Sequence, residues 1–110
     1  MDDQTKTIIQ NHIDGNDVCL FMKGTPDAPQ CGFSMAVSNI LRLLEVNYKG
    51  VNVLEGQNLR DGIKIFSDWP TIPQLYIKKE FVGGCDIIKE MYENGELKKI
   101  FEDKGINFKK

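Results

Sequence analysis

The sequence predicts an α/β protein in which a mixed four-stranded sheet lies between layers of helices. The chain has 110 residues, 41% of them hydrophobic and 27% charged, which suits one globular domain over residues 1–110. Apolar residues recur at helical spacing in several segments, and shorter apolar segments separate them. One of these, residues 18–22, is a continuous apolar run, typical of a strand that helices cover on both faces. We therefore expect the element order α-β-α-β-α-β-β-α-α.

The first half of the chain predicts two helices and two strands. Isoleucines at helical spacing indicate a helix over residues 3–14, and residues 17–23 follow as the first strand. Residues 24–30 contain glycine and two prolines and predict a loop. A second helix begins at Cys31, and residues 48–54 alternate enough to predict the second strand. The apolar stripe of the second helix consists of Phe33, Ala36, Val37, Ile40, Leu41 and Leu44.

The second half predicts a third helix, a hairpin and two closing helical segments. The third helix spans residues 58–69, and residues 74–77 with 81–82 form the hairpin. Its turn, Lys78-Lys79-Glu80, lacks the Asn-Gly pair that such turns favour. Asp86 is expected to be the N-cap of the fourth helix, and a further turn or helix follows Gly95.

Charge and composition argue against several classes of partner. The net charge of −2 leaves no broad basic face, so we expect no nucleic acid partner. The N-terminus is polar and acidic, and no segment approaches the ~20 apolar residues of a membrane span, so we expect no membrane partner. Cys19, Cys31 and Cys85 are an odd, sparse set that suits reactive or buried thiols in a reducing compartment. We therefore expect a cytoplasmic location.

The segment Cys31-Gly32-Phe33-Ser34 is the strongest candidate for chemistry. Free amides and peptide dipoles at a helix start favour an anion, so the pKa of Cys31 should be low. Serine stands where a second cysteine would resolve a mixed disulfide, which moves the chemistry onto a partner thiol or a metal cluster. Lys23 either lowers the pKa of Cys31 further or lies along the sheet edge. Cys19, inside the apolar strand, is expected to be a core residue.

Residues 69–74, with the sequence WPTIPQ, are the second informative segment. Pro73 stands directly before a strand, where a cis peptide bond would leave the backbone polar groups of Ile72 free to bind a peptide. About 5–6% of X-Pro bonds are cis, so composition alone does not establish this conformation.

Two other groups of residues suit the charges of an amino acid or peptide. In Gly83-Gly84-Cys85-Asp86 the amides of a helix start would bind a carboxylate and Asp86 an ammonium group, or the segment is an ordinary turn. Arg60 and Lys64 lie four residues apart on one helix face, where they bind a second carboxylate or are solvated surface charges.

These motifs, in this order and spacing and together with Lys23, resemble a single-domain monothiol glutaredoxin of the CGFS type. The resemblance extends from about Ile8 to Phe101. It implies a thioredoxin-like (glutaredoxin) fold with Pro73 in the cis conformation.

The resemblance also implies glutathione as a ligand. Its glycyl carboxylate would lie near Lys23 and Arg60, its cysteinyl backbone would pair with Ile72, and Cys85 and Asp86 would hold its γ-glutamyl end. The leading hypothesis is that Cys31 and the glutathione thiolate ligate a 2Fe-2S cluster, two of each from a homodimer.

Three functions follow from this interpretation. In the first, the protein is a cluster carrier or scaffold, rather than an enzyme, and its partners are iron-sulfur apoproteins or assembly factors. In the second, Cys31 reduces glutathionylated proteins and a second glutathione, or Cys85, resolves the mixed disulfide. In the third, the protein is an adaptor with a thioredoxin fold and no redox chemistry.

Overall fold

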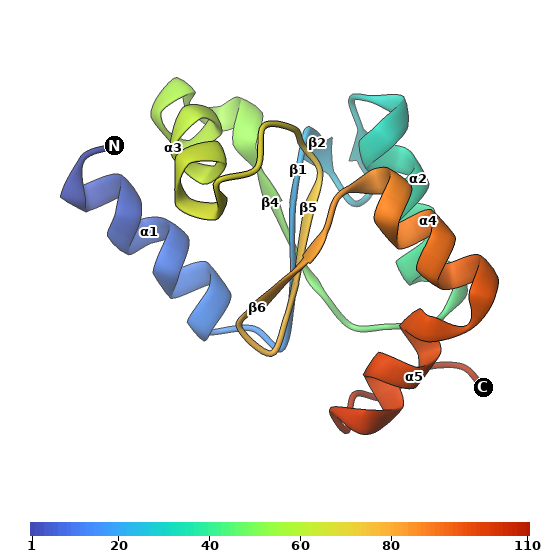
Figure 1. Ribbon diagram of the computed structural model, residues 1–110. Helices are drawn as coiled ribbons and strands as arrows, with labels where there is room; N and C mark the ends of the chain where they lie inside the picture. The colour runs from blue at the N-terminus through green and yellow to red at the C-terminus, as the bar shows by residue number, and fades with distance from the viewer.

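The computed structural model describes residues 1–110 as a mixed sheet with helices on both faces (Figure 1). The strands lie in the order β4-β1-β5-β6, and β1 pairs parallel with β4 and antiparallel with β5. β5 continues into an antiparallel hairpin with β6. The four strands are β1 (Val18–Met22), β4 (Lys49–Asn52), β5 (Gln74–Ile77) and β6 (Glu80–Gly83). The mixed four-stranded sheet expected from the sequence is thus confirmed.

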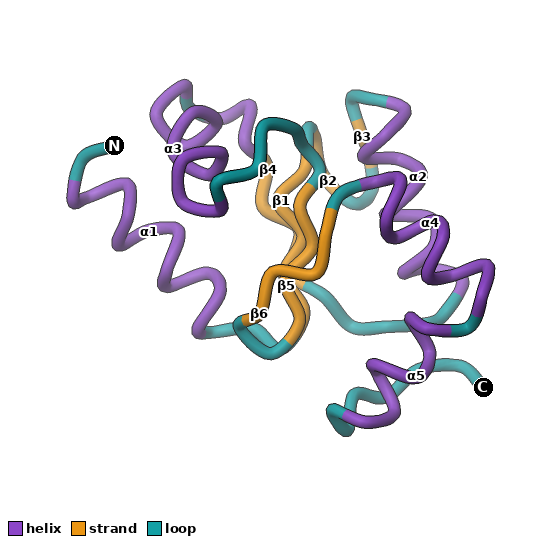
Figure 2. Tube along the Cα trace, in the orientation of Figure 1, coloured by secondary structure: helices purple, strands orange, loops and turns teal.

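Five α-helices form two layers around this sheet, as Figure 1 and Figure 2 show. The helices α1 and α3 cover one face, and α2, α4 and α5 cover the other. Their bounds are α1 (Asp3–Asp14), α2 (Gly32–Leu43), α3 (Gln57–Ser67), α4 (Cys85–Asn94) and α5 (Glu96–Asp103). None of them is both long enough and apolar enough to cross a membrane.

The central strand β1 divides the apolar interior into two cores. All five of its residues are buried, as its continuous apolar run predicts. Successive side chains of a strand point to opposite faces, so Leu20 and Met22 pack under α2 and α4, whereas Cys19 and Phe21 pack on the side of α1 and α3.

The segments on either side of α2 differ from the prediction. Residues 24–30, expected as a loop, contain a small hairpin of β2 (Gly24–Thr25) and β3 (Ala28–Pro29). The predicted strand over residues 48–54 ends at Asn52 and continues as a 3-10 turn, η1 (Val53–Glu55). The strand ends there because the side chain of Asn52 accepts a hydrogen bond from the amide of Leu54 at 3.0 Å.

Two helix boundaries also differ. The third helix ends at Ser67 because Asp68 adopts a left-handed φ of 53°, which leaves Trp69 in the following loop. The prediction that Asp86 is an N-cap was wrong, because Gly84 is the N-cap and α4 begins at Cys85. The backbone of Gly84 is extended, with φ −98° and ψ −164°, and helical geometry begins at the next residue, so Asp86 falls in the first turn instead.

Candidate functional site

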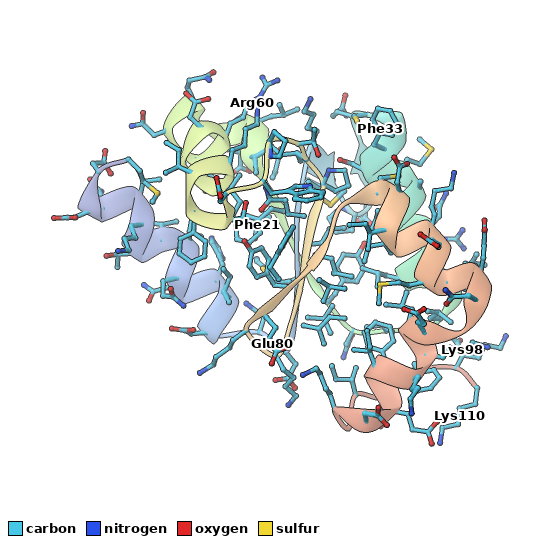
Figure 3. All side chains as sticks on the ribbon, in the orientation of Figure 1. Phe21, Phe33, Arg60, Glu80, Lys98 and Lys110 are labelled. Atoms are coloured by element: carbon cyan, nitrogen blue, oxygen red, sulfur yellow. The ribbon has the colours of Figure 1, made fainter.

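Several segments converge at one end of the sheet. The end of β1, the starts of α2 and α4, and the loop of residues 68–73 all lie at the upper end of Figure 2. Phe33 on α2 and Arg60 on α3 lie toward this end as well, on opposite sides of the sheet (Figure 3). Chain segments far apart in sequence therefore meet around Cys31.

Cys31 is the N-cap of α2, one residue before the helical turn in which it was expected. Its thiol is partly exposed and unpaired. Partial burial acts to raise its pKa, but the backbone amides of Ser34 and Phe33, the Ser34 hydroxyl and the charge of Lys23 outweigh that effect and lower the pKa. Cys31 is thus an accessible thiol that is readily converted to its nucleophilic, metal-binding thiolate.

Ser34 connects the end of β1 to the start of α2. Its side chain is fully buried, and its Oγ accepts a hydrogen bond from the backbone amide of Lys23 at 3.0 Å. The carbonyl of Lys23 in turn accepts the amide of Gln30 at 2.9 Å, directly before Cys31. These two bonds tie the backbone of Lys23 to residues on either side of Cys31, and the charge of Lys23 contributes to the lowered pKa of the thiol.

The β2–β3 hairpin precedes Cys31 and rests on the edge strand β4. The amide of Gly24 donates to the Asn52 side chain at 3.0 Å, and Pro26 lies over Gly50. A Cβ at Gly50 would lie 2.5 Å from Cγ of Pro26, so only glycine fits beneath the proline. Nothing in the local sequence indicates these long-range contacts.

A groove with a cavity volume of about 170 Å³ lies between the start of α2, the loop of residues 68–73 and the start of α4. The Ile72-Pro73 peptide bond is cis, as the resemblance implies. Ile72 is buried, and neither its backbone amide nor its carbonyl enters a hydrogen bond. The groove is lined by Phe33, Trp69, Thr71, Ile72, Pro73, Gly84, Cys85, Asp86 and Ile87.

The start of α4 offers backbone amides to the same groove. No side chain caps this helix, because Gly84 occupies the N-cap and Asp86 lies in the first turn. The first amides of α4 are therefore open to a carboxylate, which the positive end of the helix also favours. The exposed carboxylate of Asp86 lies beside them and suits an ammonium group.

The three cysteines lie in different environments. Burial, followed by the charges of Asp86 and Cys31, raises the pKa of Cys85, so its thiol loses a proton less readily than that of Cys31. Cys85 lines the groove together with Phe33, which lies two residues after Cys31. Cys19 is a core residue, as expected, and burial raises its pKa to about 12.

The structure brings most of the predicted site residues together. Ile72, Cys85 and Asp86 line the groove, and the backbone of Lys23 is hydrogen-bonded to Ser34 and Gln30, on either side of Cys31. Arg60 is half-buried on α3, does not line the groove and forms no ion pair. Trp69 and Thr71 also line the groove, although they were not predicted as site residues beyond their membership of the WPTIPQ motif.

Comparison with known proteins identifies the family. A family model described as Glutaredoxin matches residues 18–82 of the chain. The chain is 54% identical over 103 residues to a protein named probable monothiol glutaredoxin 2 from Rickettsia typhi, and the match covers 94% of this chain and 93% of that protein. It is also 54% identical over 103 residues to the mitochondrial monothiol glutaredoxin-5 of Lachancea kluyveri, covering 91% and 72%. The chain belongs to the glutaredoxin family and, within it, to the monothiol glutaredoxins.

Solved structures support the same fold. The solution structure of a monomeric truncated mutant of Trypanosoma brucei 1-C-Grx1 matches with a TM-score of 0.88 and 45% identity, covering 96% of each chain. A buckwheat glutaredoxin-glutathione complex matches with a TM-score of 0.81 over 97% of this chain and 98% of that chain. At 19% identity, the buckwheat protein is a guide to the fold alone.

Proposed function

We propose that this protein binds glutathione in the groove beside Cys31 and carries a 2Fe-2S cluster shared between two copies of the chain. The observation that carries the proposal is a single accessible thiol of lowered pKa, next to a groove edged by free backbone groups. The cluster is the cargo of such a protein. Its recipients would be iron-sulfur apoproteins or assembly factors.

Each part of glutathione has a matching group in the chain. The free backbone groups of Ile72 suit the cysteinyl backbone, as one edge of an extended peptide pairs with another. The uncapped start of α4 at Cys85 suits the γ-glutamyl carboxylate, and Asp86 suits its ammonium group. The glycyl carboxylate would bind Lys23, with Arg60 as its second cation.

The number of ligands supports sharing of the cluster. A 2Fe-2S cluster held by thiolates needs four of them. The chain nowhere groups three or more His, Cys, Asp or Glu residues that could hold a metal ion. Of the two partly exposed thiols, only Cys31 has a lowered pKa, so two copies of the chain with one glutathione each would supply four thiolates. Glutathione dissociates freely, and a cluster held in this way would be transferable.

Anaerobic reconstitution with iron, sulfide and glutathione tests the proposal. We expect the visible absorption of thiolate-bound iron and sulfide, a molecular mass that doubles with the colour, and loss of both when glutathione is omitted. Cys31→Ser should prevent the colour, whereas the matched variant Cys19→Ala, in the core, should retain it. A colourless product, or a coloured monomer, would contradict the shared cluster.

The lowered pKa of Cys31 also supports a second candidate function, reduction of glutathionylated proteins. The Cys31 thiolate would attack the glutathione sulfur of the mixed disulfide, and the protein thiolate would leave and take a proton. A second glutathione thiolate would then attack this new disulfide, releasing glutathione disulfide and restoring the Cys31 thiolate. Rapid Cys31-dependent turnover by cluster-free protein would favour this function over cluster transfer.

A further inference from the structure

Gln74, the first residue of β5, is a polar side chain with no exposure to solvent. Its Nε2 donates hydrogen bonds to the carbonyl oxygens of Trp69 and Thr71, each at 3.2 Å. Its Oε1 accepts a longer bond from the hydroxyl of Tyr76 at 3.4 Å. Because both carbonyls can only accept, they require the NH₂ end of the amide. One buried side chain therefore spans the loop between α3 and β5.

The loop has few other hydrogen bonds to fix its shape. The amides of Asp68 and Trp69 bond back to the end of α3. Residues 70–73 make no hydrogen bond between backbone groups, and Pro70 and Pro73 have no amide hydrogen to donate. The carbonyl of Thr71 thus depends on Gln74 for its hydrogen bond.

This bond determines the direction of a neighbouring group. The carbonyl of Thr71 and the amide of Ile72 belong to one peptide unit, and in a trans peptide the C=O and N–H point in opposite directions. The cis bond of the chain is the following one, Ile72-Pro73. When the Thr71 carbonyl points inward to Gln74, the Ile72 amide must point away from it. That amide is free, and Ile72 lines the groove.

We propose that Gln74 is a positioning residue for ligand binding, which holds the Ile72 amide toward the groove so that it donates to a backbone carbonyl of the bound peptide. The inference rests on the proposed binding of glutathione and adds to it a group that does not touch the ligand. Its energetic basis is plain: without Gln74, two carbonyls lose their partner and the 71–72 peptide unit is free to rotate.

The test measures binding of S-methylglutathione, which cannot react with Cys31, by calorimetry on folded protein. Gln74→Met keeps the length and volume of the side chain but has no N–H donor. We expect its Kd to be about tenfold higher than that of the wild type, or more, which corresponds to about 1.4 kcal/mol. The matched control is Tyr76→Phe, which removes the hydroxyl bond to Oε1 and leaves both donors in place. Its Kd should change less than twofold.

A second ligand separates positioning from a merely structural role. An analogue with an ester in place of the Cys-Gly amide presents a weaker carbonyl acceptor, so the wild type should bind it several-fold more weakly than S-methylglutathione. Gln74→Met should have lost this preference. A variant with a lower melting temperature but an unchanged Kd and unchanged preference would overturn the inference.

The outcomes also distinguish a failure of the Gln74 role from a failure of the proposed glutathione binding. If the wild-type protein fails to bind S-methylglutathione, the proposed function is itself overturned and the role of Gln74 with it. If the wild type binds and Gln74→Met binds equally well, only the role of Gln74 is overturned. If Gln74→Met does not fold, Gln74→Glu is measured instead. Its protonated carboxyl group has one donor where the amide of Gln74 has two, so this variant should bind S-methylglutathione with intermediate affinity.

Discussion

At the scale of single residues, the reactivity of each cysteine is set by its neighbours. Burial raises the pKa of Cys19 to about 12, and burial with nearby negative charge raises that of Cys85. Cys31 differs because the backbone amides of Phe33 and Ser34, the Ser34 hydroxyl and the charge of Lys23 all favour its thiolate. The serine that replaces a second cysteine therefore has a positive role, since it stabilises the anion.

Replacing Ser34 with alanine tests that role. The thiolate of Cys31 would lose a hydrogen bond donor, so its pKa should rise and its alkylation by iodoacetamide at pH 7 should slow. The amide of Lys23 would also lose its acceptor, which should lower the free energy of unfolding by about 1–2 kcal/mol. The measurement is the rate of alkylation against pH in a Cys85→Ser background.

The control for this prediction is Ser38→Ala on the same helix. Ser38 is buried and hydrogen-bonded to the hydroxyl of Tyr48 at 2.8 Å, one turn further from the thiol. This variant should be less stable without a change in the pKa of Cys31. If Ser34→Ala leaves the pH profile unchanged as well, the helix amides and Lys23 alone lower the pKa.

At the scale of elements, the sequence predicted what depends on local pattern. The buried strand β1 and the helix that begins beside Cys31 were correct because apolar periodicity is a property of neighbouring residues. The β2–β3 hairpin was missed because strands of two residues show no period. Its shape depends instead on Pro26 packing against Gly50, which lies on another strand.

The positions of the candidate site residues were likewise predictable where they depend on local sequence motifs. Cys31, Ile72 and Asp86 were located by motifs, because reactive groups and helix starts have local signatures. The N-cap prediction was wrong because aspartate is favoured at that position by residue type, whereas the helix here starts directly after the extended backbone of Gly84. The role of Gln74 was not visible, since it arises only when the chain folds β5 against the loop.

The β5–β6 hairpin gives a prediction at this scale. Lys78 and Lys79 have φ values of 49° and 71°, the left-handed region that Asn-Gly normally occupies in two-residue turns. Lys79→Gly should raise the free energy of unfolding by about 0.5–1 kcal/mol, because relief of the Cβ clash exceeds the added entropy of the unfolded chain. The urea midpoint measures the change.

Lys79→Ala is the control, because it removes the same charge and keeps the Cβ, so stability should change little. Lys78 is left in place, since its amide bonds to the Asp17 carbonyl and its Nζ lies 3.2 Å from the Asp17 carboxylate. A loss of stability in Lys79→Gly would mean that the turn carries no strain at this position.

At the scale of the whole molecule, the sheet separates two apolar cores. One core lies between the sheet and α2, α4 and α5, on the same side as the helix that Cys31 begins, and the other lies under α1 and α3. His12 belongs to α1 and meets the ring of Phe21 edge-on, at 6.4 Å between ring centroids. Burial, and then the charge of Lys49, lowers the pKa of His12 below its ordinary value of 6.5.

The lowered pKa of His12 makes the free energy of unfolding depend on pH. His12 binds a proton less readily in the folded state than in the unfolded chain, so its contribution to stability is complete above about pH 6.5 and is lost as the pH falls toward the folded-state pKa. His12→Gln should therefore flatten the decline of the unfolding free energy between about pH 7.5 and pH 5. Urea midpoints across this range, for both proteins, measure the difference.

The same variant shows whether the two faces act independently. Cys31 lies on the other side of the sheet from α1, and His12 contributes nothing to its lowered pKa. The alkylation profile of Cys31 should therefore be identical in His12→Gln and the wild type, while their stability curves diverge in acid. Parallel stability curves would show that His12 titrates alike in the folded and unfolded chains. A shifted alkylation profile would show instead that the sheet transmits changes from one face to the other.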